Sequence, residues 1–81
     1  MPPEDLWERL RKHPFEPFRI HLTDGAAYDV RHPELVMVGR RSAVVGVTQS
    51  EQQPPFYDRA TTVALVHIVG LEPIATPSLP S

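Results

Sequence analysis

Apolar and polar side chains alternate along Phe18-Arg19-Ile20-His21-Leu22-Thr23-Asp24-Gly25-Ala26-Ala27-Tyr28-Asp29-Val30-Arg31, on both sides of an Asp-Gly pair. Alternation with a period of two residues is typical of a half-buried strand, and Asp-Gly is typical of a tight turn. The segment therefore predicts an antiparallel hairpin with one apolar face and one polar face.

Two registers are open to this hairpin. A two-residue loop would set Ile20 opposite Asp29 and would place a charged side chain on the apolar face. A three-residue loop with Gly25 in the left-handed conformation instead pairs Ile20 with Tyr28 and Arg19 with Asp29. Apolar pairs then share one face and opposite charges share the other, so we expect the second register.

A helix is predicted before the hairpin, over residues 3–12. Leu6, Trp7 and Leu10 fall on one face, acidic residues come first and basic residues follow, which suits the helix dipole. Because a helix of about ten residues is marginal alone in water, we expect it to dock Trp7 and Leu10 on the strands.

Short strands separated by turn residues are predicted after the hairpin. We expect them over residues 35–38, 43–48 and 61–71, the first of them after a bend at His32-Pro33-Glu34. The last is apolar on both faces, as expected for a strand sandwiched between partners. The chain therefore predicts a mostly β fold with one N-terminal helix, a small five-stranded antiparallel barrel of the SH3-like or Sm-like kind. We expect one domain over residues 1–74 and a disordered C-terminal tail over residues 75–81.

Composition narrows the class of protein. With 41% hydrophobic residues and no cysteine, the 81 residues suit one small domain without disulfides, thiolate metal sites or cysteine nucleophiles. The net charge is -2 and neither half of the chain is basic, which disfavours nonspecific nucleic-acid binding. The N-terminus does not read as a secretory signal and no apolar run reaches the roughly 20 residues of a membrane span, so we expect a cytoplasmic protein without a membrane partner.

Three segments resemble a group of small uncharacterised bacterial proteins. They are Phe15-Glu16-Pro17-Phe18-Arg19-Ile20-His21-Leu22-Thr23-Asp24-Gly25, Tyr28-Asp29-Val30-Arg31-His32-Pro33-Glu34 and Leu65-Val66-His67-Ile68-Val69. The resemblance covers about residues 4–74 and implies a free-standing bacterial protein, without an activity to carry over.

The order of elements is also similar to that of Sm-like proteins, including the bacterial host-factor RNA chaperones. That family holds a uridine with an aspartate and an asparagine around an apolar pair, where this chain has His32-Pro33-Glu34-Leu35-Val36. Its second signature ends a strand with an apolar residue, a basic residue and glycine, whereas this chain has Val38-Gly39-Arg40-Arg41. No uridine-binding residue therefore carries over.

Catalytic, metal and cofactor sites find no support in the sequence. In the expected register His21 and His32 lie on opposite faces and His13 lies at the helix end, so the histidines do not form a ligand set. No serine occupies a strand-to-helix elbow, and the four glycines are too dispersed for a phosphate-binding loop. We expect no catalytic residue, metal or cofactor, and no enzyme activity.

Without a catalytic, metal or cofactor site, we expect the protein to act by binding through its surface. A partner or nucleic-acid surface is expected at Arg19, His21, Arg31, Arg40, Arg41 and Tyr57, if the barrel gathers these side chains. The apolar surplus of the last strand predicts self-association through Val63, Leu65 and Val69. The sequence thus predicts a non-enzymatic, self-associating interaction module, a homo-oligomer or the binder of a protein partner. The alternative is an Sm-like RNA- or DNA-binding protein.

Overall fold

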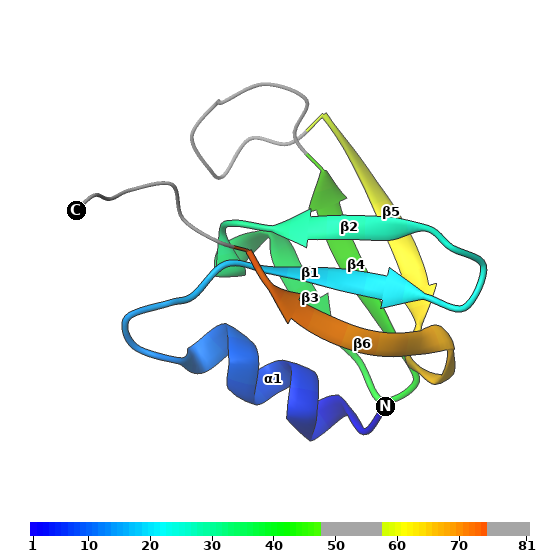
Figure 1. Cartoon of the computed structure of the whole chain (residues 1–81), viewed down its shortest axis with the longest axis horizontal. Coiled ribbons are helices and arrows are strands. Elements are labelled where there is room, and N and C mark those ends of the chain that lie inside the picture. The colour runs from blue at the N-terminus through cyan, green and yellow to red at the C-terminus, as the bar shows by residue number, and fades with distance from the viewer. Residues whose placement is uncertain (48–57, 75–81) are drawn as a thin grey trace.

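The computed structural model describes residues 1–47 and 58–74, which fold into one helix and two three-stranded antiparallel sheets (Figure 1). Sheet A has the strand order β2-β1-β6 and sheet B has the order β3-β4-β5. The elements are α1 (Pro3–Arg11), β1 (Phe18–Leu22), β2 (Ala27–Val30), β3 (Val36–Val38), β4 (Ser42–Val47), β5 (Arg59–Ala64) and β6 (Ile68–Pro73), with 3-10 turns at Pro33–Leu35 and Leu65–His67.

The predicted hairpin register is confirmed. Ile20 pairs with Tyr28, and Arg19 pairs with Asp29. Gly25 adopts a φ of 89°, and its N–H donates to the carbonyl of Leu22 across 3.0 Å. A residue with a Cβ would be strained there, so glycine stabilises the three-residue loop.

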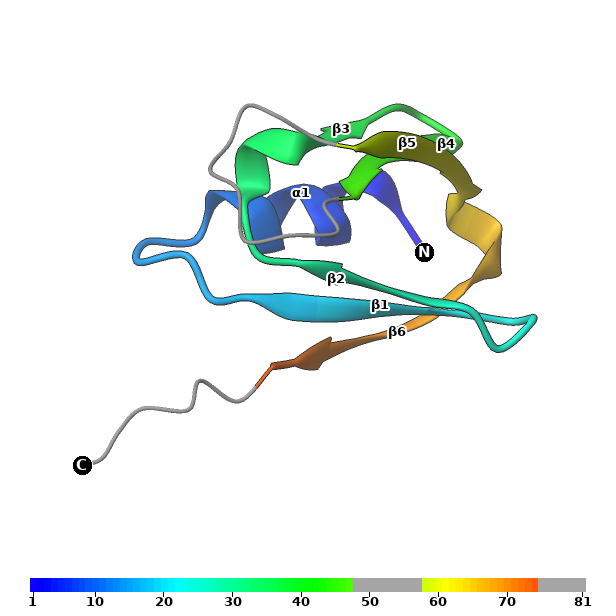
Figure 2. The ribbon, with the colours of Figure 1, turned by 90° about the horizontal axis from the view of Figure 1, so that it is seen from above.

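The prediction of a closed five-stranded barrel is wrong, because the described residues form six strands and no closed barrel. The chain passes between the sheets twice, and each passage is a 3-10 turn rather than a continuous strand. Pro33 begins the first turn, where a proline cannot donate to a strand ladder. Figure 2 shows the resulting two layers, with α1 along one open side between them.

The prediction of a single strand over residues 61–71 is wrong. The segment does not stay in one sheet. It is divided into β5 and β6 by the turn at Leu65–His67, so that its first half belongs to sheet B and its second half to sheet A. Val63 and Ile68 both face the core, from different sheets. The segment is rich in apolar residues because it serves two sheets, and not because one strand is covered on both faces.

Side chains from both sheets and from α1 build one core. The helix contributes Leu6, which is fully buried, and Leu10. Trp7 remains 49% exposed, and the Arg11 guanidinium lies 5.7 Å from the centroid of its ring. Docking of Leu10 is confirmed, but the anchor beside it is Leu6 and not the predicted Trp7. The buried apolar residues are Leu6, Leu10, Phe18, Ile20, Val30, Val36, Ala43, Val45, Val63, Leu65 and Ile68.

The predicted tail at residues 75–81 lies outside the described residues. Within the described ranges, α1 is too short to cross a bilayer, and no helix has the length and apolar character of a membrane span.

Candidate interaction surfaces

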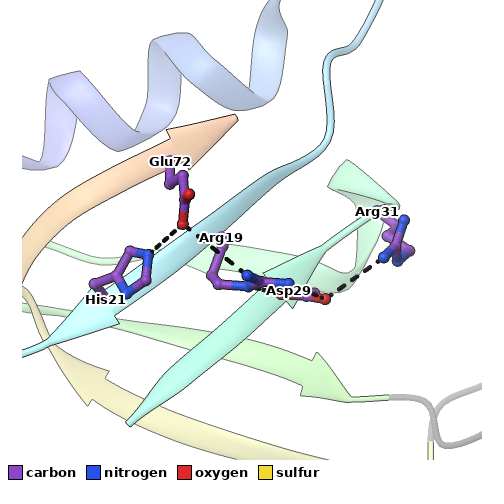
Figure 3. Close-up of polar contacts among 5 residues, drawn as sticks. All are labelled: Arg19, His21, Asp29, Arg31 and Glu72. Atoms are coloured by element: carbon purple, nitrogen blue, oxygen red, sulfur yellow. Dashed lines mark hydrogen bonds and ion pairs between the residues drawn. The ribbon is translucent and has the colours of Figure 1, made fainter. Parts of the chain in front are cut away.

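The outward face of sheet A carries a network of opposite charges, which we call the charged face (Figure 3). Arg19 of β1 donates two hydrogen bonds to the carboxylate of Asp29 on β2, at 2.6 and 3.3 Å. His21 lies 2.7 Å from Glu72 of β6, and Arg31 lies 3.5 Å from Asp29. The predicted partner residues Arg19, His21 and Arg31 are therefore brought together, but each has an acidic neighbour.

This network lowers the pKa of Asp29 below its ordinary value of 3.8, chiefly through the hydrogen bond from Arg19. Coulombic attraction to Arg19 and Arg31 acts in the same direction, while partial burial opposes it. The same hydrogen bond raises the pKa of Arg19. Both side chains are more than a third exposed, so solvent screens the pair and its contribution to stability is small.

Replacement of Arg19 by alanine is expected to raise the pKa of Asp29 toward 3.8, because its hydrogen-bond donor is lost. In the wild type, stability from Asp29 is present above the ordinary pKa of 3.8 and is lost as the pH falls through the lower native pKa. Carboxyl carbon shifts of Asp29, followed by NMR against pH, measure the change. Arg40→Ala is the control and should leave the titration unchanged, whereas an unchanged titration in Arg19→Ala would contradict the assignment.

The remaining predicted basic residues lie elsewhere. Arg40 and Arg41 are exposed on the turn between β3 and β4, whereas Arg31 lines a cleft beside the opposite end of β4. A strand of six residues is roughly 17–20 Å long. The three arginines therefore do not form one cluster. Tyr57, expected on the same surface, lies outside the described residues.

The outward face of sheet B differs from that of sheet A in having no charged side chain among its described strand positions. We call it the uncharged face. Met37, Val44 and Thr62 form one row across the three strands, and Met37 is 67% exposed. The other outward positions of β4 and β5 are Ser42, Gly46, Ala60 and Ala64. Sequence reasoning missed this face, although alternation without charge along β4 and β5 is its signal.

The sheet edges differ in how well they resist pairing with another chain. On β6, Val69 is an extra residue in a bulge and Pro73 lacks a donor, and both features hinder pairing with another strand. β2 carries Asp29 at its edge, and β3 has three residues. β5 has six residues in regular register, with no proline and no charge from Ala60 to Ala64. Among the described strands, the β5 edge is therefore the least protected.

The residues predicted to mediate self-association do not share a surface. Val63 and Leu65 are buried in the core with exposures of 4% and 2%, whereas Val69 is 64% exposed. The 3-10 turn at Leu65–His67 shifts the alternation of inward and outward side chains. Val69 therefore faces outward, although Val63 and Leu65 face inward. Val69 can contact another molecule directly, but Val63 and Leu65 are needed for packing inside the protomer.

Histidines are spread over the molecule. His67 lies near the hairpin tip, where its Nδ1 is 3.4 Å from the Thr23 hydroxyl, and His21 pairs with Glu72. Across residues 1–47 and 58–74, no three His, Asp or Glu side chains gather into a group that could hold a metal ion.

Comparisons with known proteins identify no relative: no family model, curated protein or solved structure matches the chain. The resemblance to small bacterial and Sm-like proteins stays a prediction.

Proposed function

We propose that the protein is a self-associating interaction module in which two copies pair through their β5 edges. The observation that carries this proposal is that the β5 edge is the least protected among the described strands and is continuous with the uncharged face of sheet B. A two-fold axis between antiparallel β5 strands would extend each three-stranded sheet B into one sheet of six strands. Such an isologous contact closes after two copies and leaves the charged faces in solvent.

The backbone of β5 supports pairing at its outer edge. The N–H of Leu65 donates to the carbonyl of Arg41 across 2.8 Å, just beyond the end of the β4–β5 ladder. Because the hydrogen-bonding direction alternates along an antiparallel strand, the peptide groups of Ala60, Thr62 and Ala64 point away from β4. Three consecutive outward positions thus offer donors and acceptors to a second strand.

Side chains beside this edge suit close approach. Ala60 and Thr62 are exposed and small, so a second strand can approach the backbone of β5 closely. No charge on these residues would be desolvated when the edges meet.

Nucleic-acid binding, the alternative function, has weaker support. Arg19 is neutralised by Asp29, and Arg31 is distant from Arg40 and Arg41. A polyanion is held best by several unpaired basic groups along one surface. The arrangement therefore favours self-association.

Replacement of Thr62 by lysine is expected to separate the copies. The new ammonium group would be desolvated at the shared edge, and it would face its own symmetry mate when the axis lies near the centre of β5. Sedimentation equilibrium should give twice the 9.1 kDa protomer mass for the wild type and the protomer mass for Thr62→Lys. We expect the dissociation constant to rise at least about tenfold.

Ala27→Lys is the matched control, because it places the same side chain on an exposed strand position of the other sheet. It should associate as the wild type does. A wild type that stays at 9.1 kDa at every concentration, or a Thr62→Lys variant as dimeric as Ala27→Lys, would refute pairing through β5.

A further inference from the structure

A cleft of about 270 Å³ opens between β2 and the parts of β4 and β5 that lie opposite it. It is separate from the outer edge of β5 proposed for self-association, because Thr62 does not line it. We call it the basic cleft. The polar side chains of its described lining are Tyr28, Asp29, Arg31, His32 and Arg59.

The basic cleft has a positive charge on a protein whose net charge is -2. Arg31 and Arg59 supply two guanidinium groups, and the Arg31 side chain is 55% exposed. Asp29 is the one acidic residue in the described lining, and Arg19 already donates two hydrogen bonds to its carboxylate. Asp29 also lies 3.5 Å from Arg31, so the two arginines and one aspartate of the described lining leave a net charge of +1, with His32 beside them.

We propose that the basic cleft binds a small phosphate-bearing anion, with Arg31 and Arg59 as the groups that hold its oxygens. A guanidinium offers two parallel N–H donors that match two phosphate oxygens, and such charge-assisted bonds are the strongest hydrogen bonds a surface site can make. Half-buried Tyr28 and His32 lie on the same wall and supply further polar contacts.

Size and surroundings point to a small ligand instead of a nucleic-acid strand. The cleft volume lies just below the roughly 300–1,000 Å³ typical of small-molecule sites. Beyond the cleft, the charged face alternates positive and negative side chains, so a long polyanion would meet Glu72 and Asp29 as well as the arginines. A single phosphate group avoids that repulsion.

Titration of the full chain with inorganic phosphate, AMP and adenosine, followed by NMR of backbone amides, tests the proposal. Phosphate and AMP should shift the amides of Arg31, His32 and Arg59, while adenosine should not. Arg59→Gln and Arg31→Gln should each weaken binding about tenfold or more, because each removes a charge-assisted contact. Arg40→Gln is the control, since it removes the same charge at a distant turn, and it should bind as the wild type does.

Three results would overturn the proposal. They are no shift in the cleft with either phosphate compound, equal shifts with adenosine and AMP, and equal weakening by Arg40→Gln and Arg59→Gln. Spectra of each variant without ligand show whether the fold is retained, and Arg31→Gln gives an independent test if Arg59→Gln does not fold. Thr62→Lys should bind phosphate normally, so failure of one proposal is distinguishable from failure of the other.

Discussion

Phe18→Ala should lower the free energy of unfolding by about 3–5 kcal/mol. Phe18 is fully buried and belongs to the central strand of sheet A, which pairs with β2 on one side and β6 on the other. Its ring lies 6.0 Å from that of Phe15, and the Arg9 guanidinium stacks over it at 4.9 Å. Truncation therefore leaves a cavity where both neighbouring strands and the helix meet.

A loss of this size is a large part of the total stability, which for 81 residues should be about 4–12 kcal/mol. Urea denaturation followed by circular dichroism measures it through the shift in midpoint. Phe15→Ala is the matched control and should cost less, because Phe15 is half-buried at the edge of the core. Phe18→Leu keeps most of the apolar volume and remains measurable if the alanine variant is unfolded. Equal midpoints for Phe18→Ala and the wild type would show that the core is packed differently.

Leu6→Ala should cost about 2–5 kcal/mol, whereas Trp7→Ala should cost less than about 1 kcal/mol. Leu6 is fully buried between the sheets, and Trp7, the next residue of the same helix, is about half exposed. Size alone would predict the reverse order, since tryptophan is the larger side chain. Thermal unfolding of the two variants makes the comparison directly.

The different costs expected for Leu6→Ala and Trp7→Ala follow from how α1 is rotated about its axis, and not from the presence of the helix. Trp7 lines a groove of about 390 Å³ with Val38 and Arg40, so its removal would change this surface more than the core. A greater loss for Trp7→Ala than for Leu6→Ala would mean that α1 is rotated about its axis from the orientation described.

Local patterns predicted the hairpin well because several constraints agree on it. Gly25 permits the left-handed turn, Ile20 and Tyr28 need one face, and Arg19 with Asp29 needs the other. A slip of one residue would violate all three, so the register follows from nearby residues. The Arg19–Asp29 contact in the charged face was predictable for the same reason.

Features that depend on distant segments were not predictable in this way. An apolar run such as residues 61–71 has the same composition whether it forms one covered strand or crosses between two sheets. The direction in which Trp7 points depends on the sheet that receives the helix, and the separation of Arg31 from Arg40 depends on the length of β4. The sequence does not single out Arg59, because its neighbours in the cleft come from β2 and β4. Tertiary packing decides each of these points, and a short window of sequence does not reveal which distant segments pack together.

The strand order of sheet A also has a kinetic consequence. β1 is joined to β2 by a three-residue loop, but its other partner, β6, lies far along the chain, and the His21–Glu72 contact spans 51 positions. Because closing so long a loop costs entropy before any contact repays it, the hairpin should form early and β6 should dock last. During synthesis on the ribosome, one side of β1 then stays open to solvent until β6, at Ile68–Pro73, has emerged.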